Sequence, residues 1–148
     1  MQPYDERLTA PRSWWGLSVL AGLTMGLILL PLGTLPALAG AAAGAALAAA
    51  GISTYGSARI RVVAGSLVAG SARLPASALG AVEVLDEEEA LAWRRHRADP
   101  RAFMLLRGYI PTAVRVEVDD PDDPTPYLYL STRDPQRLAA AVESLKVG

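Results

Sequence analysis

The sequence predicts an α+β membrane protein in which a transmembrane helical hairpin precedes a small antiparallel-sheet domain with an inserted short helix and a C-terminal helix. Three observations support this prediction. Residues 13–58 contain no charged side chain and no histidine, and a membrane span needs only about 20 mostly apolar residues. Short segments of two-residue alternation follow, which is typical of strands. Residues 138–145 instead repeat apolar side chains at helical spacing.

Composition excludes several classes of function. The chain of 148 residues has a formal net charge of −1, so it lacks the basic excess of a nucleic-acid-binding surface. It contains no cysteine, which excludes disulfides, thiolate metal sites and cysteine nucleophiles. Arginine almost completely replaces lysine, and alanine is abundant, a bias typical of GC-rich bacterial genomes.

The first span is predicted over residues 14–31. Trp14 and Trp15 stand at its start, and Arg12 lies just before them, separated from Trp14 by Ser13. Indole rings favour the depth at which a span meets the lipid headgroups. Residues 1–13 are therefore assigned to a cytoplasmic juxtamembrane segment.

The second span is predicted over residues 37–55. Pro31 and Pro36 bracket the connection between the spans, because proline breaks helix continuity and favours turns. The hairpin therefore occupies residues 14–57, and the α+β domain occupies residues 58–148.

Arginines near the span ends predict the topology. Arg7 and Arg12 precede the first span, and Arg59 and Arg61 follow the second. Two spans place both pairs on the same side, and arginine near span ends resists translocation. Both termini are therefore expected in the cytoplasm of a bacterium, with the protein passing twice through the plasma membrane.

Each span carries two glycines four residues apart: Gly22 and Gly26 in the first, Gly40 and Gly44 in the second. Small residues at this spacing let helix backbones approach closely in lipid. They could join copies of the chain into a homo-oligomer or pack the two helices of one hairpin together. The second interpretation is favoured, because this spacing is common in Ala- and Gly-rich spans.

A cleaved signal peptide is the alternative to the hairpin, because residues 37–39 (ALA) have the form of a cleavage site. Asp5 and Glu6 argue against it, since they dilute the positive charge that precedes a signal sequence. Cleavage would also leave residues 40–52 as an exposed apolar tail.

The domain begins with short strands separated by glycine-containing turns. Alternation and apolar composition predict strands over residues 59–63, 67–69, 79–85, 103–106, 113–118 and 127–132. The last two should form a hairpin through the turn at residues 119–126. Alternation over residues 113–118 further predicts one buried and one solvent-exposed face.

Two helices complete the domain. Residues 90–97 are predicted to lie in the short inserted helix. Asp86 is its predicted N-cap, and the acidic residues 87–89 occupy its first turn, where they complement the helix dipole. Asp134 followed by Pro135 begins the C-terminal helix in a favoured way. Its apolar residues should pack on the sheet: Leu138, Ala141, Val142 and Leu145.

Five segments carry a family resemblance: residues 4–8 (YDERL), 98–101 (ADPR), 112–118 (TAVRVEV), 123–127 (DPTPY) and 131–133 (STR). With these segments the chain resembles the actinobacterial membrane proteins grouped as domain of unknown function 3093, over nearly its whole length. The resemblance implies an actinobacterial plasma-membrane protein with two spans and assigns no catalytic residue. The element order is also similar to that of a pleckstrin-homology-like barrel or sandwich, although a fold does not establish a function.

The densest basic cluster consists of Arg94, Arg95, Arg97 and Arg101. In a domain tethered inside a membrane, these side chains could contact anionic headgroups. The favoured alternative is that they compensate a helix dipole and pair with nearby acids.

Other polar residues have simpler interpretations than a site. The four carboxylates among residues 119–123 could ligate Ca²⁺, but Asp and Pro together favour a solvated turn. His96, the one histidine, would have to be the general base of a hydrolase, and a surface helix end is the preferred interpretation. We expect no metal and no cofactor.

These observations predict a non-enzymatic, membrane-anchored interaction module that binds a protein partner or membrane lipids, and no nucleic acid. The alternative is an accessory subunit that packs through its spans in a larger membrane complex. An enzyme acting on a lipid-linked substrate is a third class. It would require polar residues such as Arg107, Tyr109, Arg115 and Tyr127 to converge.

Overall fold

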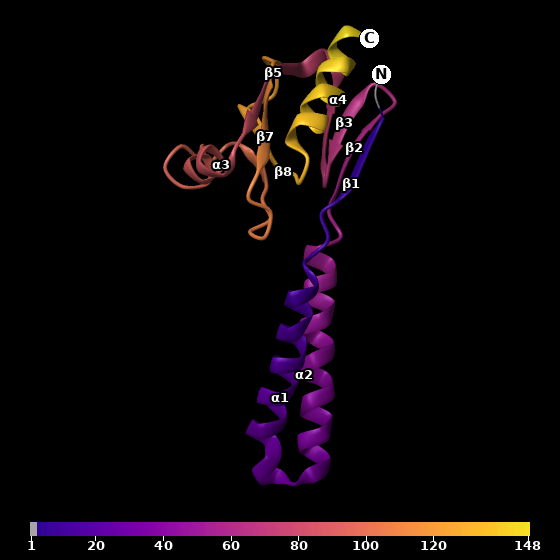
Figure 1. Cartoon of the computed structure of the whole chain (residues 1–148), viewed down its shortest axis with the longest axis vertical. Coiled ribbons are helices and arrows are strands. Elements are labelled where there is room, and N and C mark those ends of the chain that lie inside the picture. The colour runs from indigo at the N-terminus through magenta and orange to yellow at the C-terminus, as the bar shows by residue number, and fades with distance from the viewer. Residues whose placement is uncertain (1–2) are drawn as a thin grey trace. The chain divides into compact units, whose positions relative to one another are not determined.

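The computed structural model describes residues 3–148 and confirms the predicted α+β class (Figure 1). The chain divides into two compact units. One is a helical hairpin over Thr9–Ala58, and the other is a domain that combines the N-terminal residues through Leu8 with Arg59–Gly148.

The hairpin consists of two long apolar helices, α1 (Trp15–Leu29) and α2 (Thr34–Tyr55). Short 3₁₀ turns, η1 (Arg12–Trp14) and η2 (Leu30–Leu32), precede and follow α1. Together with these turns, the first helical segment runs over Arg12–Leu32; this segment and α2 are each long and apolar enough to cross a membrane. Most of their large apolar side chains are exposed, an arrangement compatible with lipid around the hairpin.

The turn of the hairpin is tighter than predicted. Gly33 has a φ of 121°, which glycine adopts without steric cost, and α2 begins at the next residue. Pro36 therefore lies in the first turn of α2 instead of ending the loop. A helix tolerates proline there because the N–H groups of its first turn have no intrahelical partner.

The first sheet of the domain is antiparallel, with the order β1-β2-β3-β4. Its strands are β1 (Tyr4–Arg7), β2 (Arg59–Val63), β3 (Ser66–Ala69) and β4 (Ala72–Pro75). Residues 1–13 are predicted to be a segment separate from the domain, whereas β1 pairs with β2 and belongs to the sheet. Four residues with three charges carry too little apolar pattern to reveal a strand.

The second sheet has the order β5-β7-β8-β6. Its strands are β5 (Leu79–Leu85), β6 (Phe103–Leu105), β7 (Ala113–Val118) and β8 (Tyr127–Ser131). The predicted hairpin of β7 and β8 is present. However, β6 pairs in parallel with β8, so this sheet is mixed and not wholly antiparallel. A strand's composition does not reveal the direction of a partner that is distant in the chain.

Both predicted helices begin at their predicted caps. In α3 (Glu87–Arg94), Asp86 and Glu89 form a reciprocal capping box. This helix ends three residues earlier than predicted. In α4 (Pro135–Val147), the Asp134 side chain accepts the N–H of Arg137.

The C-terminal helix α4 completes the core of the domain. It contacts β5 and β7 of the second sheet and β1 and β2 of the first (Figure 1). Its predicted apolar face is buried: Leu138, Ala141, Val142 and Leu145. The short turn η3 (Ala76–Ala78) links the two sheets.

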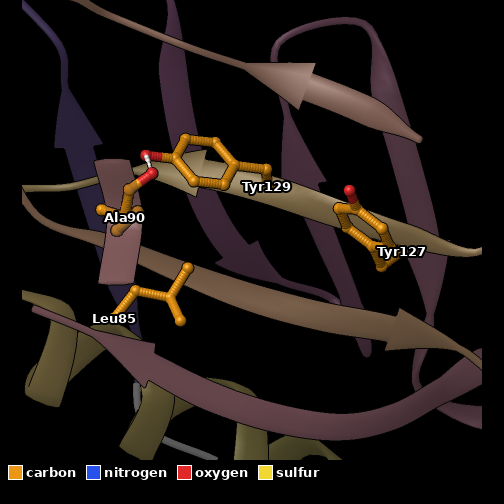
Figure 2. Close-up of a cluster of buried hydrophobic side chains, with 5 residues drawn as sticks. Leu85, Ala90, Tyr127 and Tyr129 are labelled. Atoms are coloured by element: carbon orange, nitrogen blue, oxygen red, sulfur yellow. Dashed lines mark hydrogen bonds between the residues drawn. The ribbon is translucent and has the colours of Figure 1, made fainter. Parts of the chain in front are cut away.

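The face of β7 that was predicted to be exposed is instead partly covered. Leu85, Ala90, Ala113, Tyr127 and Tyr129 form a buried cluster in which α3 packs on this face (Figure 2). The hydroxyl of Tyr129 donates to the carbonyl oxygen of Ala90 at 3.5 Å. The side chains of β7 therefore point alternately to the two faces of the sheet, as predicted, but α3 and its neighbours partly cover the second face.

Candidate functional site

The four arginines of the predicted basic cluster differ in exposure and in their contacts. Arg94 is half-buried, and its Nε finds no acceptor among residues 3–148. Arg101 forms an ion pair of 3.0 Å with Asp99, and its hydrogen bonds lower the pKa of the Asp99 carboxyl. Arg97 lies over the ring of Trp93 at 5.9 Å. Arg95 alone is exposed without such a contact in the described chain, so the geometry favours local structural roles.

Arg115 is held firmly on the outer face of the second sheet. Its guanidinium group donates to Glu83 at 2.7 Å and to Glu117 at 3.0 Å. It also lies 4.5 Å from the ring of Trp93 and 5.7 Å from that of Tyr127. Partial burial lowers the pKa of Arg115, but the hydrogen bonds with the two carboxylates outweigh this effect and raise it. Arg115 is therefore paired and stacked within the domain.

The polar residues considered for an enzyme separate into two pairs. Arg115 and Tyr127 lie together under α3, as described above. Arg107 and Tyr109 lie in the loop before β7, where the N–H of Arg107 donates to Ser131 Oγ and the Tyr109 hydroxyl donates to the carbonyl of Leu8. Arg107 and Tyr109 thus bind Ser131 of β8 and the backbone at Leu8.

A buried polar network joins the N-terminal strand to the start of α4. Glu6 Oε2 accepts hydrogen bonds from the Tyr4 hydroxyl at 2.7 Å and from Thr132 Oγ1 at 2.5 Å. Glu6 Oε1 accepts the N–H of Arg133 at 3.0 Å, and Thr132 Oγ1 accepts the N–H of Asp134 at 3.1 Å. Residues 4–8 and 131–133, two of the segments that carry the family resemblance, therefore meet in space.

Tyr4 is the most perturbed group of this network. It is buried, and its hydroxyl also lies 3.0 Å from Thr132 Oγ1. Burial, with the negative charge of Glu6 nearby, raises the pKa of Tyr4. The phenol therefore stays protonated and donates to Glu6. The network fastens β1 to the domain.

The glycines of the two spans face each other within one hairpin. A Cβ atom at Gly22 would lie 2.8 Å from the carbonyl oxygen of Ala41, and one at Gly26 would lie 3.2 Å from Ala41 Cβ. Gly40 and Gly44 approach side chains of α1 in the same way. The arrangement supports the interpretation that the two helices pack on each other.

The turn at residues 119–126 has the features of a solvated turn. Asp120 accepts the N–H of Asp122 at 3.0 Å, and Asp123 accepts the N–H of Thr125 at 2.9 Å. Residues 3–148 include no group of three His, Cys, Asp or Glu side chains placed to hold a metal ion. His96 is exposed beyond the end of α3.

The outer face of the first sheet carries an arginine cluster whose members are scattered along the sequence and were not predicted as a site. The strand register places Arg61 and Arg73 in one row with Asp5, and Arg7 beside Arg59 in the next. All four arginines are exposed. Asp5, the one acid on this face among the described residues, pairs with Arg59 at 2.5 Å. We call these four arginines the arginine face, and alternation within each strand is the signal that could have revealed it.

Comparison with known protein families places the chain beside proteins of unknown function. The family model described as protein of unknown function (DUF3093) matches residues 3–142, and so includes both the hairpin and most of the domain. No curated protein and no solved structure matches the chain.

Proposed function

The chain belongs to the DUF3093 family of proteins of unknown function, and we propose that it is a non-enzymatic, membrane-anchored interaction module whose recognition surface lies in its α+β domain. In this proposal the hairpin is the anchor. The domain binds a protein partner or the inner membrane surface.

The observation that carries this proposal is the packing of the hairpin. Its four spaced glycines are directed at the neighbouring helix of the same chain. Faces of this kind are what a span would offer to another membrane protein. Because the hairpin uses them internally, recognition by the domain is favoured over an accessory subunit that packs through its spans.

The placement of the polar residues supports a binding role over an enzymatic one. Arg115 is neutralised by two carboxylates, and Tyr109 is engaged by the backbone of Leu8. An active site needs a nucleophile, a base or an electrostatic stabiliser directed at one point. These groups instead stabilise neighbouring strands.

We further propose that both termini, and with them the domain, lie in the cytoplasm beneath the plasma membrane. Arginines flank both ends of the hairpin, and the connecting turn carries none. Single cysteines at Thr34, in the turn of the hairpin, and at Ser71, in the domain, would report this topology, because both positions are exposed and the chain has no native thiol. Labelling of Thr34→Cys but not of Ser71→Cys from outside intact cells is expected; the reverse pattern would contradict it.

Two chimeras test whether binding partners are recognised by the α+β domain or by the hairpin. The first replaces residues 12–55 with an unrelated two-span hairpin, and the second keeps residues 12–55 but replaces residues 59–148 with a fluorescent protein. Each is crosslinked in the source organism, extracted in mild detergent and captured beside the full chain. We expect proteins or lipids enriched with the full chain to follow the first chimera. Enrichment that follows only the second would identify a subunit that packs through its spans.

A further inference from the structure

We propose that the arginine face of the first sheet, formed by Arg7, Arg59, Arg61 and Arg73, binds the anionic lipid headgroups of the membrane in which the chain is anchored. The inference deepens the proposed function by naming the partner of the domain, and it therefore rests on that function.

The first argument is the chemical state of these arginines. Arg59 is paired with Asp5, whereas the side chains of Arg7, Arg61 and Arg73 make no hydrogen bond or ion pair with any residue between 3 and 148. The face thus has four positive charges and one negative charge. Guanidinium groups bind phosphate oxygens through two parallel hydrogen bonds, and a lipid headgroup offers such oxygens. Arg97, Arg101 and Arg115, by contrast, already have partners in the domain.

The second argument is the length of the chain between this sheet and the hairpin. Four residues separate Arg7 from η1, and three separate Tyr55 from Arg59. An extended chain spans at most about 3.6 Å per residue, so Arg59 lies within about 15 Å of the end of α2. The Debye length at physiological salt is about 8 Å. The tether therefore keeps Arg59 within about two Debye lengths of the end of the predicted span, and the strand register places the other three arginines on the same face as Arg59.

The third argument separates lipid from protein as the occupant. Protein interfaces depend on a few buried anchors, most often Trp, Tyr or Arg set in an apolar pocket. The apolar side chains on this face are small, namely Val63, Val68 and Pro75, and the described part of the face includes no aromatic ring. A charged sheet face without apolar anchors matches a headgroup layer better than a protein surface.

The experiment uses the full chain in nanodiscs. A spin label is attached at Ser71→Cys, which lies in the β3–β4 turn, where the neighbouring Gly70 N–H donates to the carbonyl of Arg59 at 3.0 Å. Gadolinium-chelating lipid in the headgroup layer reports the approach of the label. We compare discs of phosphatidylcholine alone with discs that contain about 30% phosphatidylglycerol, a charge density chosen to resemble an anionic leaflet.

The expected result is stronger relaxation of the label in the anionic discs, and loss of this difference at high salt. A triple variant, Arg7→Gln, Arg61→Gln and Arg73→Gln, should lose it as well. Each arginine near an anionic surface contributes about fivefold in affinity, so loss of three should weaken the contact by about 100-fold. Thermal unfolding of this variant should be unchanged, because the three side chains are exposed.

The matched control removes the same number of charges from the other basic segment: Arg95→Gln, Arg97→Gln and Arg101→Gln. It should keep the lipid-dependent approach. Equal relaxation in both kinds of disc, or equal loss in both triple variants, would overturn the proposal. Loss of a captured protein in the first variant, with no change in headgroup contact, would also overturn it. The chimera experiment could still support the interaction module, so the two failures are distinguishable.

Discussion

Replacing Thr132 with valine tests whether the buried network holds the N-terminal strand on the domain. The Thr132 side chain is fully buried and donates to the Glu6 carboxylate at 2.5 Å. It also accepts the N–H of Asp134 at 3.1 Å. Valine has nearly the same shape but can make neither hydrogen bond, so Thr132→Val should remove the polar contacts with little change in packing.

The expected magnitude follows from these two contacts. A hydrogen bond to a charged group contributes about 1.5–3 kcal/mol, and leaving a buried donor without a partner costs about 1–3 kcal/mol. Because neighbours relax in part, we expect Thr132→Val to lower the free energy of unfolding by about 3 kcal/mol. For a domain of about 100 residues, this corresponds to a fall in Tm on the order of 10 °C or more.

The assay is thermal unfolding of the full chain in detergent, together with amide hydrogen exchange of β1 and β2. Exchange in these strands should increase most, because Glu6 lies on β1. Tyr4→Phe combined with Thr132→Val should show a coupling energy of at least about 0.5 kcal/mol. Thr125→Val, outside the network, serves as the control. A change below about 0.5 kcal/mol for Thr132→Val, or strictly additive effects, would refute the role assigned to the network.

Three further predictions concern the hairpin, the inserted helix and pH. Gly22→Ala should weaken packing of the hairpin in an SDS-unfolding titration, because the new Cβ would lie 2.8 Å from the carbonyl oxygen of Ala41. Gly51→Ala, with no atom within 4 Å of its new Cβ, should be neutral or stabilising, and equal effects of the two variants would contradict close packing of α1 on α2 at Gly22. Asp86→Ala should destabilise α3 by about 1 kcal/mol through loss of its N-cap, measured as faster amide exchange in that helix, whereas Glu87→Gln should change it little. Because burial raises the pKa of Tyr4, the unfolded chain ionises first above about pH 10, so the stability that this residue contributes is complete below that pH and falls above it. Alkaline unfolding of Tyr4→Phe should therefore depend less on pH, and an unchanged profile would argue against the shift.

Elements with strong local signals are the ones that the sequence predicts well. The strand over residues 79–85 and the strand over residues 113–118 have the predicted bounds. The C-terminal helix begins at the predicted cap, because the Asp134 side chain and the ring of Pro135 act on their own turn. Capping and alternation depend only on residues a few positions apart, so they can be recognised in the sequence alone.

The candidate surfaces were harder to predict because they depend on pairing between distant segments. Arg94, Arg97 and Arg101 are close in the chain and look like one basic cluster, yet their surroundings differ. The Nε of Arg94 finds no acceptor among residues 3–148, Arg97 lies over the ring of Trp93, and Arg101 pairs with Asp99. Arg7 and Arg73 are far apart in the chain, and only the successive pairing of β1 with β2, β2 with β3 and β3 with β4 brings them to one face.

The sequence by itself determined the division into an apolar helical hairpin and an α+β domain, together with the caps and most strand positions. Hydropathy, periodicity and capping are properties of contiguous residues, so they need no knowledge of the fold. Only the tertiary structure decided that residues 4–7 join the first sheet, that β6 runs parallel to β8, and that four arginines share an outer face. These features arise from hydrogen bonds between strands, such as β1 and β2, that lie far apart in the chain, and the sequence of either strand alone does not specify its partner.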